Sequence, residues 1–173
     1  MDKPILNTAD APRSTGQHGA TFAYEMRELA GPLGAREIGA NLTRVPPGHA
    51  ALPFHHHYAN EEHFFVVSGS GVLRVGAERH PVKAHDYMVH RPGGPELAHQ
   101  LINTGTEDLV YLAISTMRVP EVVGYPDSGK TGVRAVPDKR FLVSGATVAA
   151  SLGYWDGEDG RAVAAVLADK EGG

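Results

Sequence analysis

The sequence contains no cysteine. Disulfide bonds and thiolate ligands are therefore excluded, and any bound metal ion must be held by nitrogen and oxygen atoms. The chain also lacks an apolar run near the ~20 residues that a membrane-spanning helix needs, and its first residues lack the apolar core of a secretory signal. These absences predict a cytoplasmic location and no membrane partner.

Positive charge is not concentrated in any part of the chain. The 16 lysine and arginine residues are scattered, and the formal net charge is -4. Nucleic acids and anionic membrane surfaces are bound through basic patches, so no nucleic-acid partner is expected. A small molecule is the expected ligand, and a chain of 173 residues is long enough for one domain with a buried core.

A histidine-rich segment carries the strongest indication of chemistry. His55 and His57 are two residues apart, so on a strand both imidazoles point to the same side while His56 points away. The polar residues 58–61 can turn the chain, and Glu62 begins a run rich in aromatic and β-branched residues, which predicts a second strand. The two strands can bring two imidazoles and a carboxylate together.

Glu61 competes with Glu62 for the carboxylate position. If Glu61 points inward, the strand register shifts by one residue, and Phe65 and Val67 replace Phe64 and Val66 inside. Both sets of side chains are apolar, so hydrophobic periodicity leaves both registers open.

A third histidine comes from a later strand. His99 follows a turn rich in proline and glycine, residues 91–95, and begins a short apolar strand. Leu101 and Asn103 share its face by the period of two. Three imidazoles and one carboxylate suit Fe, Mn, Ni, Co or Zn as a divalent ion, and we predict that His55, His57, Glu62 and His99 hold one such ion.

These residues also resemble the paired motifs of the cupin superfamily. The first motif contains Gly48, His55, His57, Glu62 and Gly69, and the second contains Pro92, Gly94, His99 and Asn103. Two loop spacings are longer than usual, and His85-Asp86 replaces the Gly-Asp that usually opens the second motif. No ligand position is lost. The motif spacing to Gly69 favours Glu62, and Glu61 then becomes an acceptor that orients a ligand imidazole.

The resemblance implies an all-β cupin barrel, a double-stranded β-helix or jelly roll, similar to small one-domain bacterial cupins. Some of these carry a sugar-phosphate isomerase label. The strand pattern agrees, because short apolar runs recur at regular spacing with no long helical pattern between them. The expected strands cover residues 41–45, 62–67, 72–75, 87–90, 98–102 and 109–115.

Three regions are expected along the chain. Residues 1–20 form an N-terminal arm that is loose or docked on a partner subunit, residues 21–120 form the barrel, and residues 121–173 form an extension that packs on the barrel or on a partner. Within the extension we expect a loop over 124–139, strands over 141–143 and 147–152, and a short helix over 159–170. Related folds commonly dimerise through edge strands, so a homodimer is expected.

Inward-facing side chains are expected to form a small cup around the metal ion. The predicted substrate-binding residues are Phe64, Tyr87, Leu101 and Asn103. Arg44 either faces solvent or pairs with an anion, because an unpaired arginine is costly to bury. Tyr154 and Trp155 either cover the mouth of the barrel or attach the tail to the outer face of a sheet or to a second subunit.

Three functions are compatible with these residues. The first is a metal-dependent isomerase or lyase acting on a small polar, sugar- or sugar-phosphate-like substrate. The second is a non-haem iron dioxygenase, which needs the same ligands. The third is a non-catalytic protein that binds a small molecule. The sequence favours the first.

Overall fold

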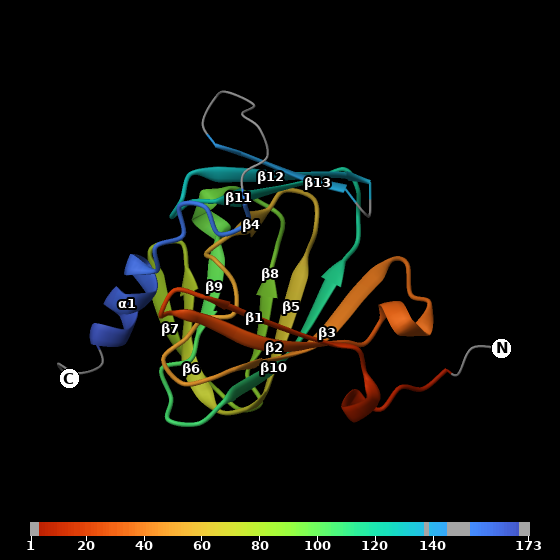
Figure 1. Ribbon diagram of the computed structural model, residues 1–173, viewed down its shortest axis with the longest axis horizontal. Coiled ribbons are helices and arrows are strands. Elements are labelled where there is room, and N and C mark those ends of the chain that lie inside the picture. The colour runs from red at the N-terminus through yellow and green to blue at the C-terminus, as the bar shows by residue number, and fades with distance from the viewer. Residues whose placement is uncertain (1–3, 137–138, 145–152, 170–173) are drawn as a thin grey trace.

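The computed structural model describes residues 4–136, 139–144 and 153–169, and nearly all regular structure in these residues is β-strand (Figure 1). The one α-helix described is α1 (Arg161–Ala168). Short 3-10 helices are η1 (Thr8–Asp10), η2 (Gly31–Leu33) and η3 (Pro95–Leu97). The strands are β1 (Arg13–His18), β2 (Phe22–Glu28), β3 (Ile38–Val45), β4 (His56–His57), β5 (Glu62–Ser68), β6 (Ser70–Val75), β7 (Glu78–Lys83), β8 (Tyr87–His90), β9 (His99–Ile102), β10 (Leu109–Thr116), β11 (Glu121–Tyr125), β12 (Lys130–Val136) and β13 (Lys139–Ser144).

The strands form three antiparallel sheets. The largest has the order β1-β2-β3-β10-β5-β8, the second β13-β12-β11-β4, and the third β7-β6-β9. In Figure 1 the strands β11 to β13 lie across one end of the barrel, and α1 lies at its side near β7. The expected all-β barrel with a short C-terminal helix is thereby confirmed. No helix in the described part of the chain is long and apolar enough to span a membrane.

The core lies between the facing sheets and fixes the register of β5. Phe64 and Val66 are 6% and 0% exposed, whereas Phe65 and Val67 are 37% and 45% exposed. Burying such a side chain contributes roughly 1.5–3 kcal/mol, so a shift by one residue would lose several contributions at once. The inward register with Glu62, Phe64 and Val66 on one face is therefore the observed one.

Gly69 makes the turn between β5 and β6 possible. Its φ is +82°, in the left-handed region that favours glycine. A Cβ at this position would also collide with the carbonyl oxygen of Asp108. Both the turn and the close approach of the neighbouring loop therefore require glycine.

Part of the expected N-terminal arm is not loose. Residues 13–18 form β1, which pairs with β2 along its whole length, from Arg13 opposite Arg27 to His18 opposite Phe22. The sequence gives no sign of this strand because β1 is polar and mostly exposed on both faces, so apolar and polar residues do not alternate in it.

The expected loop over 124–139 is wrong. Most of this segment belongs to β11 and β12, which pair from Glu121 opposite Arg134 to Tyr125 opposite Lys130. Gly129, with φ of +65°, lies in the turn between them, so the glycine that suggested a loop connects two strands. The expected strand over 141–143 lies within β13, and the one over 147–152 lies outside the described residues.

The C-terminal segment packs on the outside of the barrel. The Trp155 ring stacks on His18, with centroids 4.7 Å apart, and the Tyr154 ring meets Tyr125 edge-on. Lys130 forms a buried ion pair with Glu158 at 2.9 Å. Helix α1 is shorter than expected and buries its valines against a cluster of Phe22, Ala50 and Ile102. Tyr154 and Trp155 thus attach the tail to the barrel, as the second of the two hypotheses expected.

Candidate metal centre

Two of the predicted ligands are brought together by backbone pairing. His55 and His99 form an antiparallel bridge in which each backbone N–H donates to the carbonyl of the other, at 3.2 and 2.8 Å. Their ring centroids are consequently 4.7 Å apart. His57 follows two residues later in β4, and Glu62 begins β5, so three strands converge on one point.

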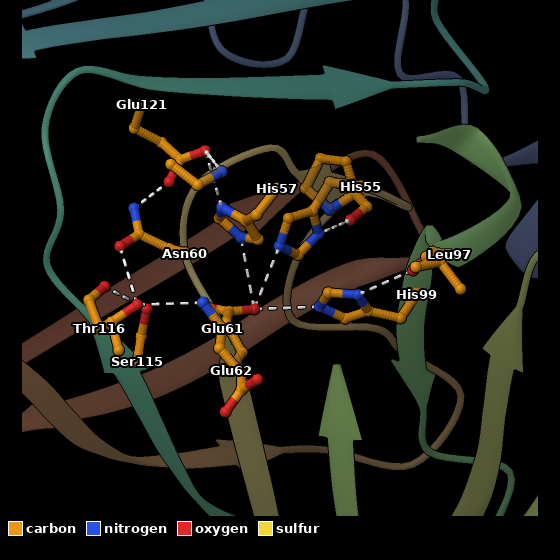
Figure 2. A network of polar contacts seen from close by, with 12 residues as sticks. His55, His57, Asn60, Glu61, Glu62, Leu97, His99, Ser115, Thr116 and Glu121 are labelled. Atoms are coloured by element: carbon orange, nitrogen blue, oxygen red, sulfur yellow. Dashed lines mark hydrogen bonds and ion pairs between the residues drawn. The ribbon is translucent and has the colours of Figure 1, made fainter. Parts of the chain in front are cut away.

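One carboxylate oxygen of Glu62 lies at the centre of this group. The Nε2 atoms of His55, His57 and His99 are 3.6, 3.4 and 3.0 Å from Glu62 Oε2. Figure 2 shows the three imidazoles pointing to that oxygen. The cluster of His55, Glu62 and His99 can hold a metal ion, and His57 approaches it from the side of the neighbouring cavity.

Each imidazole has an acceptor behind it. His55 Nδ1 donates to the Pro53 carbonyl at 2.8 Å, and His99 Nδ1 lies 3.5 Å from the Leu97 carbonyl. His57 Nδ1 lies 3.8 Å from Oε1 of Glu121. A ring whose Nδ1 carries the proton presents the lone pair of Nε2 to the centre, and such partners are typical behind metal-binding histidines.

Glu121 is the most important residue of the site that the sequence analysis missed. Its carboxylate is 2% exposed and accepts hydrogen bonds from the backbone N–H groups of Tyr58 and Ala59 and from the side chain of Asn60. Figure 2 shows Glu121 above His57, on the side opposite Glu62. A usable signal exists in the sequence, because Glu121 is the only charged residue in the apolar segment 119–125.

The charges in the group depend on one another. Burial alone would lower the pKa of His57, but the carboxylates of Glu121 and Glu62 outweigh it and raise that pKa from 6.5 to about 9. Burial would raise the pKa of Glu62, yet the surrounding histidines hold it well below 4.5. Burial lowers the pKa of His99 to about 4. At neutral pH His57 is therefore protonated, whereas His99 is neutral.

His90 lies beside the histidine cluster and packs against His99. Its ring stacks on His99 with centroids 3.8 Å apart and planes 12° apart. Burial lowers its pKa to about 3, so the ring is neutral. The His90 ring packs against both Phe64 and His99 and thereby limits the movement of the His99 imidazole.

A cavity of about 370 Å³ opens beside His57 and Glu62. None of the four predicted substrate-binding residues is among those lining it. The lining residues are Glu28, Gly39, Ala40, Asn41, His57, Asn60, Glu62, Ala113, Ser115, Met117, Glu121, Val123, Gly132 and Arg134.

The four predicted substrate-binding residues have other places in the fold. Phe64 and Leu101 belong to the central core. Tyr87 is 60% exposed on the outer face of β8 and contacts His63, because Met88 and His90 are the inward residues of that strand. Asn103 is fully buried and bonds the backbone of Val45, Gly105 and Glu107, so it stabilises loops.

Two further polar residues also lie away from the centre. Glu61 pairs with His63 at 2.8 Å on the outer side of β5, so the expectation that it orients a ligand imidazole is wrong. Glu121 occupies that position instead. Arg44 faces solvent and pairs with Asp108.

Comparison with known proteins agrees with this architecture. Residues 41–115 match the model of the Cupin domain family. Together with the observed barrel, this match supports a cupin fold around that segment. No curated protein is a significant match to the whole sequence.

Solved structures with the same fold include proteins with different assigned reactions. A proposed sugar phosphate isomerase from Acidithiobacillus ferrooxidans is 24% identical, with a TM-score of 0.71 over 87% of this chain and 98% of that chain. A sugar phosphate isomerase of the cupin superfamily from Silicibacter pomeroyi is 22% identical, with a TM-score of 0.73 over 87% and 100%. A proposed oxalate decarboxylase from Thermotoga maritima is 21% identical, with a TM-score of 0.56 over 66% and 99%. At these identities the likeness shows the fold alone.

Proposed function

We propose that the protein is a metal-dependent enzyme that isomerises or cleaves a small polar, sugar- or sugar-phosphate-like substrate. His55, His57, Glu62 and His99 would hold one divalent ion, chosen from Fe, Mn, Ni, Co and Zn. The observation that carries the proposal is the convergence of three Nε2 atoms on one oxygen of Glu62, with an acceptor behind each ring.

The donor set fits a divalent ion of this kind. Both ring nitrogens of His57 are buried and have no hydrogen-bond partner among the described residues, although two carboxylates lie close by. A buried polar atom without a partner is costly, and a metal ion bound to Nε2 would satisfy that nitrogen. Imidazole and carboxylate ligands suit the ions named above.

A divalent ion at this place would supply Lewis acidity to a substrate carbonyl or hydroxyl oxygen. The chain itself contributes the cavity, which is lined by amide and hydroxyl groups from Asn41, Asn60 and Ser115. These groups suit a polar ligand better than an apolar one. The names of the two isomerases with the same fold are consistent with such a substrate.

Proton transfer requires a group outside the ligand set, and the cavity offers two carboxylates. Glu121 is held by three N–H donors and faces His57, so we assign it to orientation of that ring. Glu28 is exposed, and the only hydrogen bond that its carboxylate accepts from the described residues comes from the Gly31 backbone. We therefore assign proton transfer to Glu28.

The experiment is deuterium exchange by metal-loaded protein that was purified without a histidine tag. Phosphorylated aldoses and ketoses are incubated with it in D2O, and the C–H next to the carbonyl is followed by NMR. We expect exchange that requires metal, that is lost in His99→Ala, and that is slowed in Glu28→Gln at unchanged metal content. Oxygen consumption with Fe(II), or binding without exchange, would instead identify a dioxygenase or a non-catalytic protein.

A further inference from the structure

The cavity has a wall that the cupin segment does not provide. Glu121 and Val123 of β11 and Gly132 and Arg134 of β12 all line it, and they are cross-strand partners in register. These four residues, here called the cover, lie outside the matched residues 41–115. Arg134 is the cavity's only lysine or arginine among the lining residues.

Arg134 has a charge to which the described residues offer no partner. Its Nε is buried without a hydrogen bond, and no ion pair joins its guanidinium to the part of the chain that the structure describes. By contrast, Arg44 and Arg74 pair with Asp108 and Asp127. A guanidinium is always charged and presents a planar set of N–H donors that fits phosphate and carboxylate groups.

The neighbouring carboxylates do not take this role. Glu121 is directly opposite Arg134 in the sheet, but both of its oxygens accept hydrogen bonds from residues 58–60. Glu62 is surrounded by three histidines. The N–H donors of Arg134 thus remain free for a ligand that enters the cavity.

Arg134 stands at a distance from the metal centre that a small molecule can span. His57 pairs with Val123, which pairs with Gly132, two residues from Arg134. From strand spacing and rise per residue, the Cα atoms of His57 and Arg134 are about 12 Å apart. Both side chains border the same cavity, so one ligand can reach both.

We propose that Arg134 binds an anionic group, a phosphate or a carboxylate, of the substrate whose other end lies at the metal centre. This inference rests on the proposed function for the metal centre. It makes Arg134 a specificity-determining residue, because a neutral substrate of the same shape would leave its N–H donors without a partner.

The test compares metal-chelating ligands with and without an anionic group. Calorimetry on the metal-loaded full chain measures the affinity of phosphoglycolohydroxamate and of its neutral analogue glycolohydroxamate. The monohydroxamate of succinic acid and neutral butyrohydroxamate form a second pair, which distinguishes carboxylate from phosphate. We expect a preference for the anionic member of at least one pair.

Arg134→Gln should lower affinity for the preferred anionic ligand by about 10- to 100-fold, the worth of a charge-assisted hydrogen bond. Its affinity for the neutral ligand and its metal content should not change, which also shows that the variant is folded. Arg44→Gln makes the same change in net charge at an exposed residue that does not line the cavity, and it should keep the preference.

Equal affinities within both pairs, or a preference that survives Arg134→Gln, would overturn the anion site alone. If no hydroxamate binds in a metal-dependent way, the proposed function is overturned and the anion site with it.

Discussion

Two regions that contribute residues to the cavity wall differ strongly in character. The metal side consists of His55, His57, Glu62 and His99, which lie within the cupin segment and converge through short turns and one backbone bridge. The cover lies on β11 and β12, beyond that segment, and its polar members are Glu121 and Arg134. If both proposals hold, the first region provides the metal chemistry and the second provides orientation and selectivity.

The largest expected effect is on the metal side. His57→Ala and His99→Ala should each abolish stoichiometric metal binding, because a ligand is lost from a group of four, while circular dichroism still shows a folded β-protein. His63→Ala is the matched control, since His63 lies on the outer side of β5 beside Glu61 and should retain metal. Full metal content in both ligand variants by elemental analysis would refute the centre.

The contribution of the cover to metal binding should be smaller but measurable. Glu121→Gln removes the charge behind His57 and should lower metal affinity by about 10- to 100-fold, as loss of a partner behind a ligand typically does. Competition with a chelator of known affinity measures it. Glu61→Gln serves as the control and should bind like the parent protein. Equal metal affinities of the two variants would show that Glu121 does not support metal binding.

Metal binding should also displace a proton. The metal-free protein holds His57 with a pKa of about 9, so this ring is protonated at pH 7.5, whereas His99, with a pKa of about 4, is not. A metal ion binds only the neutral imidazole, so binding at pH 7.5 should release close to one proton. Calorimetry in buffers of different ionisation enthalpy counts it. Binding without proton release would mean that His57 does not become a ligand.

The smallest effect concerns the stability of the metal-free protein. Between pH 6.5 and about 9 the folded state retains a proton on His57 that the unfolded state has lost, so stability falls as pH rises through this window. Below pH 6.5 the unfolded state binds protons on His90 and His99, whose pKa values in the folded state are only about 3 and about 4. The free energy of unfolding therefore falls as the pH drops. Urea denaturation with a chelator present should therefore show a maximum near pH 6.5. A monotonic change from pH 5 to 9 would contradict these protonation states.

The clustering of His55, Glu62 and His99 can be predicted from the sequence because the information for it is local. The two-residue spacing of His55 and His57, the turn before Glu62 and the turn before His99 are all visible within short segments. The inward register of β5 needed the motif spacing as well, since both of its faces are apolar. The match over residues 41–115 covers this part of the chain.

The cover could not be predicted because its residues meet the site only through pairing of distant strands. Glu121 reaches His57 because β11 pairs with β4, with Val123 opposite His57. No local pattern encodes a pairing between residues so far apart in the sequence. Tyr87 was placed wrongly for a similar reason, since four residues of β8 do not reveal which face is inward. Asn103 shares its face with His99, but the strand ends before it, so its amide bonds loops instead.

A buried ion pair between Lys130 of β12 and Glu158 joins the C-terminal tail to the strand that carries Arg134. Lys130 lies in β12, four residues before Arg134, and its ammonium group has Glu158 and the Tyr154 carbonyl as partners. Removing one member of a buried pair typically costs about 3–5 kcal/mol, because the other charge stays buried without compensation. The tail and strands β11 and β12 should consequently open together as one cooperative unit. The shape of the cavity wall would then depend on residues 153–169, none of which lines the cavity.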